Sequence, residues 1–433
     1  MSRCVPEAGS GDAVRQTGAM ENADPDAVRT EVRDWLAANW DPDLALVEWR
    51  RRLAGAGWAV PSWPERWHGR GLPAWADEVV ADELAAAGCV GPPVGSGTSL
   101  AAPTVLAHGP DALRERFLPP TLTGEVTWCQ LFSEPGAGSD LAGLTARAEL
   151  DGDEWVINGQ KVWNTSAHHA DLGMLLARTD WDAPKHKGIS YFVLPMRQPG
   201  VEARPLRQMN DHASFNEVFL SDARVPHDHV VGGVGDGWRA ALTTLAFERR
   251  FGALGRPRFA AGAGRALEEA RREAEAHFET YKWYPQRAGR ADLLLERAHA
   301  TDAGADPATR DEVARVLSMS RVGRWTAERA RAALASGRTP GPEGSIGKLA
   351  ASHLARRAAA AHTMITGAEA MLTGADSPLD GVVAEIIVSV PAQSIAGGTD
   401  EVQRNIVAER QLGLPRDPST DIGRPFRELP RNG

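Results

Sequence analysis

The sequence is poor in cysteine and contains no long apolar run, and both absences narrow the class of protein. Its 433 residues include three cysteines, Cys4, Cys89 and Cys129, which lie far apart and lack the close spacing of metal ligands. This pattern predicts reduced thiols and no metal site. The N-terminus lacks the apolar segment of a signal peptide, and no segment reads as a membrane span. We therefore expect a cytoplasmic protein without membrane insertion.

A basic run is also missing. Lys and Arg number 48 against 57 Asp and Glu, giving a formal net charge of −9, with the two signs interspersed. This balance argues against nucleic acid as a partner. The length predicts two or three layers or subdomains with enough apolar material to enclose a large cofactor.

The spacing of apolar residues changes twice along the chain. In the first quarter of the chain, apolar residues recur every three or four positions, with breaks at Gly and Pro. Next, apolar residues recur every second position, and long Ala-rich helical patterns return after Gly235. This order predicts an α+β, mainly helical fold, with a middle antiparallel β domain between two helical domains. The expected boundaries are a disordered extension at 1–19, helices at 20–125, the β domain at 126–234, a helix bundle at 235–425 and a tail at 426–433.

Two features of local sequence sharpen this prediction. The Pro- and Trp-rich segment 58–73 is predicted to be an ordered loop held by Trp58, Trp63 and Trp67. Asp151-Gly152 and Asn158-Gly159 are typical of two-residue hairpin turns, because a type I′ turn needs positive φ at both positions.

The segment SEPGAGSD, Ser133 to Asp140, is the most informative for function. Gly136 and Gly138 let the backbone approach a ligand closely, and Ser133 and Ser139 can donate hydrogen bonds to anionic or carbonyl oxygens. Alone, such a turn is more often structural. It is followed, however, by NGQKVWNTSA, where Trp163 can cover an aromatic ring and Thr165 can bond to a ring nitrogen.

Together these segments resemble the acyl-CoA dehydrogenase family over nearly the whole chain. The resemblance includes the order of helical, β and helical domains, FNEVFLSDARVP, TTLAFERR, and the C-terminal IAGGTDEVQRNIVAERQLGLP. It implies FAD as cofactor, an acyl-CoA substrate and electron-transfer flavoprotein as acceptor. It also implies a role in fatty acid or steroid side-chain degradation.

The resemblance assigns individual residues to the cofactor. The implied FAD contacts are Ser133 at the flavin pyrimidine edge, Ser139 at the pyrophosphate with Gly138 beside it in the same turn, Trp163 and Thr165 at the isoalloxazine, and Thr399 with Glu401 in the C-terminal motif. Two readings stay open. In the alternative to FAD binding, Trp163 is an ordinary aromatic residue of the core, and Glu401 is a solvated residue on a helix surface.

The catalytic base needs a carboxylate beside the thioester, and the C-terminal motif does not supply one. Many family members carry Glu immediately before the Gly-Thr of this motif, whereas this chain has Gly397. A minority pattern in the family places the base in an "ER" pair on the first long helix of the C-terminal domain. Glu248 and Arg249 match that pair, so Glu248 is the expected base and Arg249 an expected substrate contact. The backbone N–H of Gly397 is expected to stabilise the enolate oxygen.

Two features of the family pattern are altered on the side of the FAD site that faces a neighbouring subunit. No Arg-x-x-Phe-Gly segment is recognisable between Arg310 and Gly344, and the Gly-rich stretch before the last helices is weak. This resembles a bacterial branch in which two related subunits share flavin sites. The chain is thus expected to form a homotetramer or an α2β2 heterotetramer.

Four other interpretations remain at this stage. In the first, Glu248 is a surface residue paired with a neighbouring Arg. In the second, the chain is a non-catalytic or flavin-sharing structural subunit of a heteromeric acyl-CoA dehydrogenase. A flavoprotein of the DNA-damage response is disfavoured by the acidic balance. An oxidase that passes electrons to dioxygen is not distinguished by sequence.

Overall fold

The computed structural model describes residues 23–251, 262–335, 343–416, 418 and 421–430, so the predicted extension at 1–19 lies outside the described residues. The fold is α+β and mainly helical, as predicted. Contacts divide the chain into two compact units, Met1–Trp128 with Gly255–His277, and Cys129–Leu254 with Phe278–Gly433. Each unit is described by itself.

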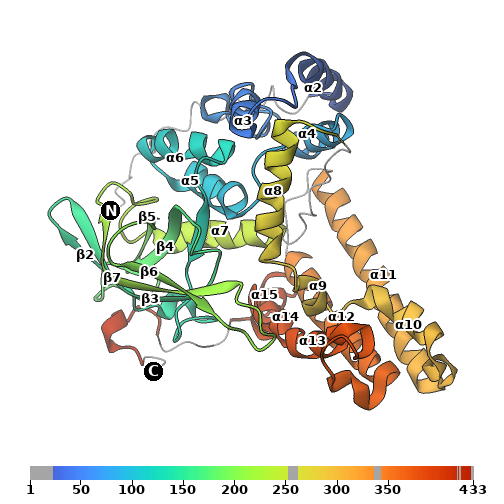
Figure 1. Ribbon diagram of the computed structural model, residues 1–433. Helices are drawn as coiled ribbons and strands as arrows, with labels where there is room; N and C mark the ends of the chain where they lie inside the picture. Colours follow the sequence, from blue (N-terminus) through green and yellow to red (C-terminus); the bar gives the residue numbers. More distant parts are fainter. Residues whose placement is uncertain (1–22, 252–261, 336–342, 417, 419–420, 431–433) are drawn as a thin grey trace. The chain divides into compact units, whose positions relative to one another are not determined.

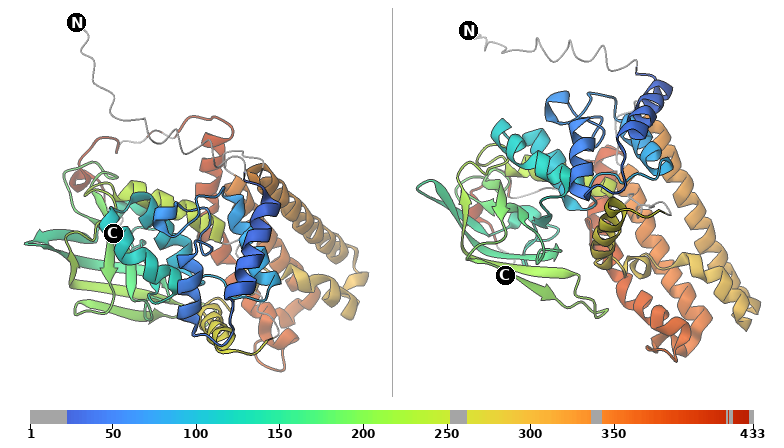
Figure 2. Two further views of the ribbon diagram at one scale, coloured as in Figure 1. Left: turned by 90° about the horizontal axis from the view of Figure 1, so that it is seen from above. Right: turned by 45° about the horizontal axis from the view of Figure 1, so that its top comes forward.

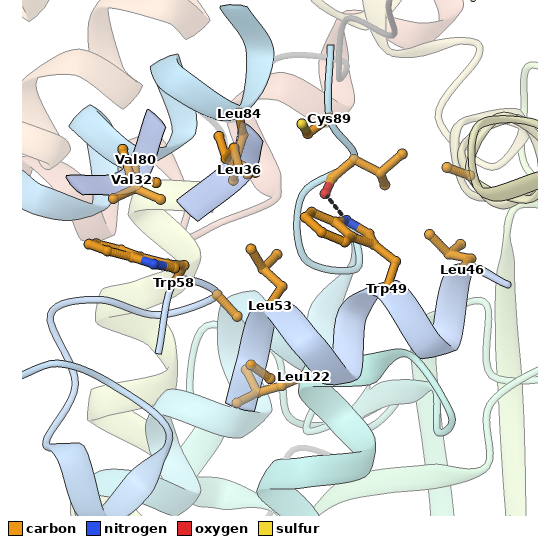
Figure 3. Close-up of a cluster of buried hydrophobic side chains, with 14 of the residues drawn as sticks. Val32, Leu36, Leu46, Trp49, Leu53, Trp58, Val80, Leu84, Cys89 and Leu122 are labelled. Carbon is orange, nitrogen blue, oxygen red and sulfur yellow. Dashed lines mark hydrogen bonds between the residues drawn. The ribbon is translucent and has the colours of Figure 1, made fainter. Parts of the chain in front are cut away.

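The first unit is a helical layer around a core rich in tryptophan. Its elements are α2 (Pro25–Asn39), α3 (Leu46–Gly55), η1 (Glu65–Trp67), α4 (Trp75–Ala86), the π-helical η2 (Gly97–Ala101), α5 (Ala102–His108), α6 (Asp111–Thr123) and most of α8 (Arg265–Glu279). Figure 3 shows Trp49 of α3 at the centre of this core, with its indole N–H donating to the carbonyl of Val90 at 2.6 Å. The polar edge of this large side chain is thereby satisfied inside an apolar core.

The loop at 58–73 is ordered, as predicted. Trp58 and Trp67 are buried and Trp63 packs partly against the core. Gly69 is required here, because a Cβ at this position would lie 2.0 Å from the carbonyl oxygen of Trp63.

Helix α8 packs with the N-terminal helices, although the sequence prediction grouped it with the C-terminal bundle. Leu267 and Ala270 enter the same core. The Glu269 carboxylate accepts from the backbone N–H of Leu46 at 2.8 Å, and Glu273 pairs with the buried Arg50 at 2.6 Å. Apolar spacing predicted the helix correctly but carries no information on which core its buried face meets.

The second unit contains a seven-stranded sheet. Its strands are β1 (Trp128–Leu131), β2 (Arg147–Asp151), β3 (Glu154–Thr165), β4 (Leu172–Arg178), β5 (Ile189–Pro195), β6 (Val201–Leu206) and β7 (Phe215–Pro226). The order is β1-β4-β2-β3-β7-β6, with β5 beside β4. The β2–β3, β3–β7, β4–β5 and β6–β7 pairs are antiparallel, as predicted, and β2 pairs with β4 in parallel.

One of the two predicted hairpin turns is wrong. A hairpin does form at Asp151-Gly152, but Asp151 pairs with Glu154, so the turn residues are Gly152 and Asp153. Of these, Gly152 alone has a positive φ, 65°, so the turn is not of the predicted type I′. At Asn158-Gly159, in contrast, β3 continues and shifts register against β7. Gly159, with a φ of 154°, is there because a Cβ would lie 2.7 Å from the Cα and the Cβ of Ala146. The glycine therefore marks a bulge and a close strand contact, not a turn.

Replacing Gly159 with alanine should lower the free energy of unfolding by about 1–3 kcal/mol, because strand β2 must move to admit the new methyl group. Gly347→Ala in helix α12 (Glu343–Thr366) is the matched control. No atom lies within 4 Å of that Cβ position, so the substitution should stabilise by up to about 1 kcal/mol through helix propensity. Urea unfolding of both variants measures the difference, and equal effects would contradict this packing.

The C-terminal helices of the second unit form a bundle in which α11 runs beside α12 (Figures 1 and 2). The elements are α7 (Gly237–Phe251), α9 (Tyr284–Arg287), η4 (Ala291–Leu293), α10 (Leu294–Ala300), η5 (Asp302–Ala305), α11 (Pro307–Ala335), α12 (Glu343–Thr366), η6 (Gly367–Met371), η7 (Pro378–Gly381), α13 (Val382–Ser389), α14 (Pro391–Ile395), α15 (Asp400–Arg410) and η8 (Phe426–Glu428).

The stretch Pro378–Arg410 is long and apolar enough to cross a membrane by composition, with a mean hydropathy of 1.4 in its most apolar window. The structure divides it into η7, α13, α14 and α15, with a turn at 396–399. Its apolar residues thus belong to several short helices instead of one continuous helix.

Candidate active site

The Gly/Ser turn at 133–140 follows β1 and is tied to β3. The carbonyl of Ser133 accepts from the backbone N–H of Val162 at 2.9 Å, and Glu134 and Ala137 exchange backbone hydrogen bonds. Gly138 and Ser139 lie on the exposed side of the turn, while Ser133 is half-buried. The turn thus presents small and hydroxyl-bearing residues on a rigid backbone.

A buried ion pair between Lys161 and Glu134 fixes the backbone of this turn. The Lys161 ammonium donates to the Glu134 carboxylate at 2.8 Å and to the carbonyl of Phe132 at 3.0 Å. Burial raises the pKa of Glu134, but Lys161 and the backbone N–H groups of Thr145 and Ala146 outweigh it, so the pKa lies below its ordinary value. Burial lowers the pKa of Lys161, and Glu134 offsets part of that effect.

Trp163 is held in an unusual position by a bulge. The register of β3 against β7 shifts between Lys161 and Asn164, and Trp163 adopts a φ of +64°, which is strained for an aromatic residue. Its indole packs edge-on against Phe215 at 5.8 Å between ring centroids, and 57% of the residue stays exposed. The alternative of an ordinary core aromatic therefore does not describe Trp163.

Thr165 and two tyrosines meet at the end of β3. Tyr281 makes a side-chain hydrogen bond with Thr165, and its ring packs edge-on against Tyr284 at 4.8 Å. Burial first, and the charge of Glu248 in addition, raises the pKa of both Tyr281 and Tyr284, so both hydroxyls stay protonated. The charge of Glu248 therefore acts on both tyrosines.

Helix α7 positions Glu248 because it starts in close contact with β5. A Cβ on Gly237 would lie 2.4 Å from the carbonyl carbon of Ser190, and Thr244 lies 3.3 Å from the hydroxyl of Tyr191. Glu248 is half-buried, and its Oε2 accepts from the Gln130 amide at 3.3 Å. The side chain of Arg249, the predicted substrate contact, lies outside the described residues.

The C-terminal motif forms a turn with two glycines at positive φ, 67° at Gly397 and 84° at Gly398. The Gln403 amide donates to the carbonyl of Gly397 at 2.9 Å. Thr399 caps α15, its hydroxyl oxygen accepting from the N–H of Val402, which leaves its proton for another acceptor. Glu401 is exposed and pairs with Arg404 at 3.2 Å.

Two further contacts fix this motif in the bundle. The buried Asp400 pairs with Lys348 of α12 at 3.0 Å. Arg287 of α9 donates to the side chain of Gln393 in α14, the helix that leads into Gly397. Because α9 also carries Tyr284, this one short helix contacts both α14, which leads into the C-terminal motif, and the tyrosine pair next to Thr165.

Sequence reasoning missed three residues of this site: Gln130, Tyr281 and Tyr284 lie outside every motif used. The only signal was the aromatic density of the segment Phe278 to Tyr284. His168 and His169, which the sequence left without a role, are exposed neighbours with ring centroids 3.8 Å apart, and His168 bonds to Asn216 at 2.9 Å.

The residues present fit a flavin. An exposed indole held in the left-handed region offers a flat apolar face, the neighbouring threonine offers a hydrogen bond, and an exposed Gly-Ser turn suits a pyrophosphate. Burial and, in addition, the charge of the half-buried Glu248 carboxylate raise the pKa of Tyr281, and Tyr281 bonds to this threonine. Such a set of groups suits redox chemistry coupled to removal of a proton.

Comparison with known proteins agrees with this reading. Residues 22–125, 129–223 and 288–412 match the N-terminal, middle and C-terminal domains of acyl-CoA dehydrogenase, respectively. Acyl-CoA dehydrogenase IpdE1 of Mycobacterium tuberculosis is 36% identical over 420 residues, covering 91% of this chain and 99% of the relative.

Two solved structures are similar over the same length. The ChsE4-ChsE5 complex from Mycobacterium tuberculosis has a TM-score of 0.62 and 27% identity, covering 91% of this chain and 98% of the matched chain. The Tcur3481-Tcur3483 steroid ACAD has a TM-score of 0.63 and 26% identity, covering 91% and 99%.

The fold and these matches define the class of protein as an oxidoreductase of the flavin-dependent kind. The chain belongs to the acyl-CoA dehydrogenase family, as the sequence motifs predicted.

Proposed function

We propose that this chain catalyses FAD-dependent α,β-dehydrogenation of an acyl-CoA thioester, with Glu248 removing the α proton. The observation that carries the proposal is the position of Glu248 on α7, where its carboxylate accepts from the Gln130 amide at 3.3 Å and where burial, together with its charge, raises the pKa of Tyr281, which bonds to Thr165. Bound FAD supplies the acceptor for the β hydride. Everything else in the mechanism is done by side chains and backbone groups of the protein.

Each remaining predicted residue has one part in this scheme. The N–H of Gly397 stabilises the thioester oxygen as negative charge develops there. Arg249 contacts the substrate. The flavin and its pyrophosphate are held by Ser133, Gly138, Ser139, Trp163, Thr165, Thr399 and Glu401.

Glu248 must be able to accept a proton while the reacting carbon stays dry. Tyr281 and Tyr284 do not compete with Glu248 as bases, because burial raises their pKa values and keeps both hydroxyls protonated. Gln130 donates to Oε2 of Glu248 at 3.3 Å, which orients the carboxylate that accepts the proton.

We propose a bulky acyl chain, of the kind found in steroid side chains, and an α2β2 assembly with a related subunit. The similarity to a structure named as a steroid ACAD and to the two-subunit ChsE4-ChsE5 complex supports both points. Electron-transfer flavoprotein is the proposed electron acceptor and the cytoplasm the proposed location. A flavin-sharing structural subunit is the alternative, and a functioning base at position 248 separates the two.

The visible spectrum of the purified protein tests the cofactor. We expect oxidised-flavin absorbance from the chain together with a related subunit, and less than one FAD per chain when it is purified alone. Stoichiometric FAD and full activity in a homotetramer would rule out the heterotetramer. A colourless protein in every combination would rule out the proposed function itself.

A further inference from the structure

The C-terminal residues 421–430, of which 426–430 belong to the predicted tail, fold back onto the β domain (Figure 1). We call this segment the C-terminal clasp. The N–H of Phe426 donates to the carbonyl of Ala183 at 3.1 Å, and the N–H of Arg427 donates to the carbonyl of Trp181 at 3.0 Å. Phe426 and Leu429 are buried, so the clasp is part of the folded unit.

The ring of Phe426 covers a buried guanidinium. Arg178, at the end of β4, is 0% exposed, and its Cζ lies 3.3 Å from the centroid of the Phe426 ring. Burial lowers the pKa of Arg178 to about 10, with partial compensation from the charges of Glu134 and Asp140. A cation held this far from water depends strongly on the aromatic face that covers it.

Arg178 in turn holds the backbone that follows the Gly/Ser turn. Its Nη2 donates to the carbonyl of Ala142 at 2.7 Å and its Nε to the carbonyl of Leu144 at 3.2 Å. Its own N–H donates to the carbonyl of Ala146 at 2.7 Å. One side chain thereby positions 142–144 immediately after Ser133–Asp140.

A second contact runs from the clasp to the turn through Lys185. The Lys185 ammonium lies 2.6 Å from the carboxylate of Asp140, the last residue of the turn, and 4.0 Å from that of Asp421 in the clasp. Lys185 is only 17% exposed on its side chain, so this contact is shielded from solvent more than an ordinary surface pair.

From these contacts we infer that the C-terminal clasp is part of the cofactor site: Phe426, through Arg178, positions the Gly/Ser turn at the end that receives the FAD pyrophosphate. This rests on the proposed function for the identity of the ligand. The contacts of the clasp lie within the protein and do not depend on the identity of the ligand. Phe426 is a positioning residue, because it touches Arg178 and not the proposed ligand.

The test is Phe426→Ala in the full chain. Uncovering Arg178 lets water compete for its hydrogen bonds, so amides of residues 139–146 should exchange hydrogen faster, while those of β6 and β7 stay unchanged. FAD affinity, followed by flavin fluorescence, should fall roughly tenfold, the size of one desolvated cation–π contact. Phe426→Tyr keeps the ring and should retain parent behaviour in both measurements.

Arg424→Ala is the matched control in the same segment, since Arg424 is exposed and its guanidinium bonds to Glu428 within the clasp. It should leave exchange and FAD affinity unchanged. If amide hydrogen exchange at residues 139–146 were unaltered in Phe426→Ala, the inferred positioning role of Phe426 would be overturned. Faster exchange with unaltered FAD affinity would overturn its link to the cofactor. A parent chain that binds no FAD, alone or in an assembly, would overturn the proposed function, while exchange would still report on the clasp.

Discussion

Replacing Glu248 with glutamine should lower kcat for acyl-CoA dehydrogenation by roughly 10²- to 10⁴-fold, the range found when a general base is removed. The amide cannot accept the α proton, yet it has nearly the shape of the carboxylate and its oxygen can still accept from Gln130. FAD content and thermal stability should therefore stay close to those of the parent. Steady-state turnover with a dye as electron acceptor measures the loss.

Glu296→Gln on α10 is the control, because Glu296 is an exposed glutamate on another helix of the same unit. It should leave kcat within twofold of the parent. Glu248→Asp keeps a carboxylate but withdraws it by one methylene, so its kcat should fall between those of the parent and Glu248→Gln. If Glu248→Gln turned over like the Glu296 control, the structural-subunit interpretation would replace the catalytic one.

Replacing Lys161 with methionine should lower the free energy of unfolding by about 3–5 kcal/mol, the typical cost of removing one partner from a buried ion pair. Lys161 is 0% exposed, and its loss leaves the Glu134 carboxylate buried without its ammonium partner. Glu134 would keep the donors from Thr145 and Ala146, which is why the variant should still fold. Urea unfolding at neutral pH measures the change.

The Lys161→Met, Glu134→Gln double variant separates the ion pair from simple packing. Because it removes the unpaired charge, it should be more stable than Lys161→Met alone, and a double-mutant cycle should show strong coupling. Additive effects would show that the two side chains act independently.

The same pair predicts a dependence on acid. The folded pKa of Glu134 lies below its ordinary value of 4.5, so its contribution is present above 4.5 and is lost as the pH falls through the folded pKa. The stability difference between the parent and Glu134→Gln should therefore shrink as the pH drops below about 4.5.

Much of the fold could be predicted from local sequence because the relevant forces are local. Helix α2 begins where Asp24 caps it, its carboxylate accepting from the N–H of Asp26, with Pro25 in the first turn. Strands β5 and β7 follow apolar, β-branched runs between Gly and Pro residues. Such signals give the kind of element and its approximate bounds.

Long-range packing decided the features that were missed. Gly159 is a bulge instead of a turn because Ala146 of the neighbouring segment approaches it, and α8 joins the N-terminal core because Leu267 finds apolar partners there. Helices α13 and α14 lie within the predicted bundle, in a stretch where Pro378, Gly381 and Pro391 interrupt the periodicity. Patterns of local sequence do not predict these long-range contacts.

The same limit applies to the site. Motifs identified the Gly/Ser turn, Trp163 and Glu248, because each belongs to a pattern of several residues. Gln130, Tyr281 and Arg178 act through tertiary contacts with those residues and carry no pattern of their own. The strained backbone at Trp163 was also invisible in the sequence, although it sets the exposure of the indole.

Rapid anaerobic mixing of the FAD-loaded protein with a saturated bulky acyl-CoA tests the central claim most directly, since flavin reduction in one turnover requires loss of the α proton. With the parent, oxidised-flavin absorbance should disappear within a single turnover. With Glu248→Gln carrying equal FAD, the absorbance should persist while the thioester still binds. Reduction at the parent rate in Glu248→Gln would contradict the account.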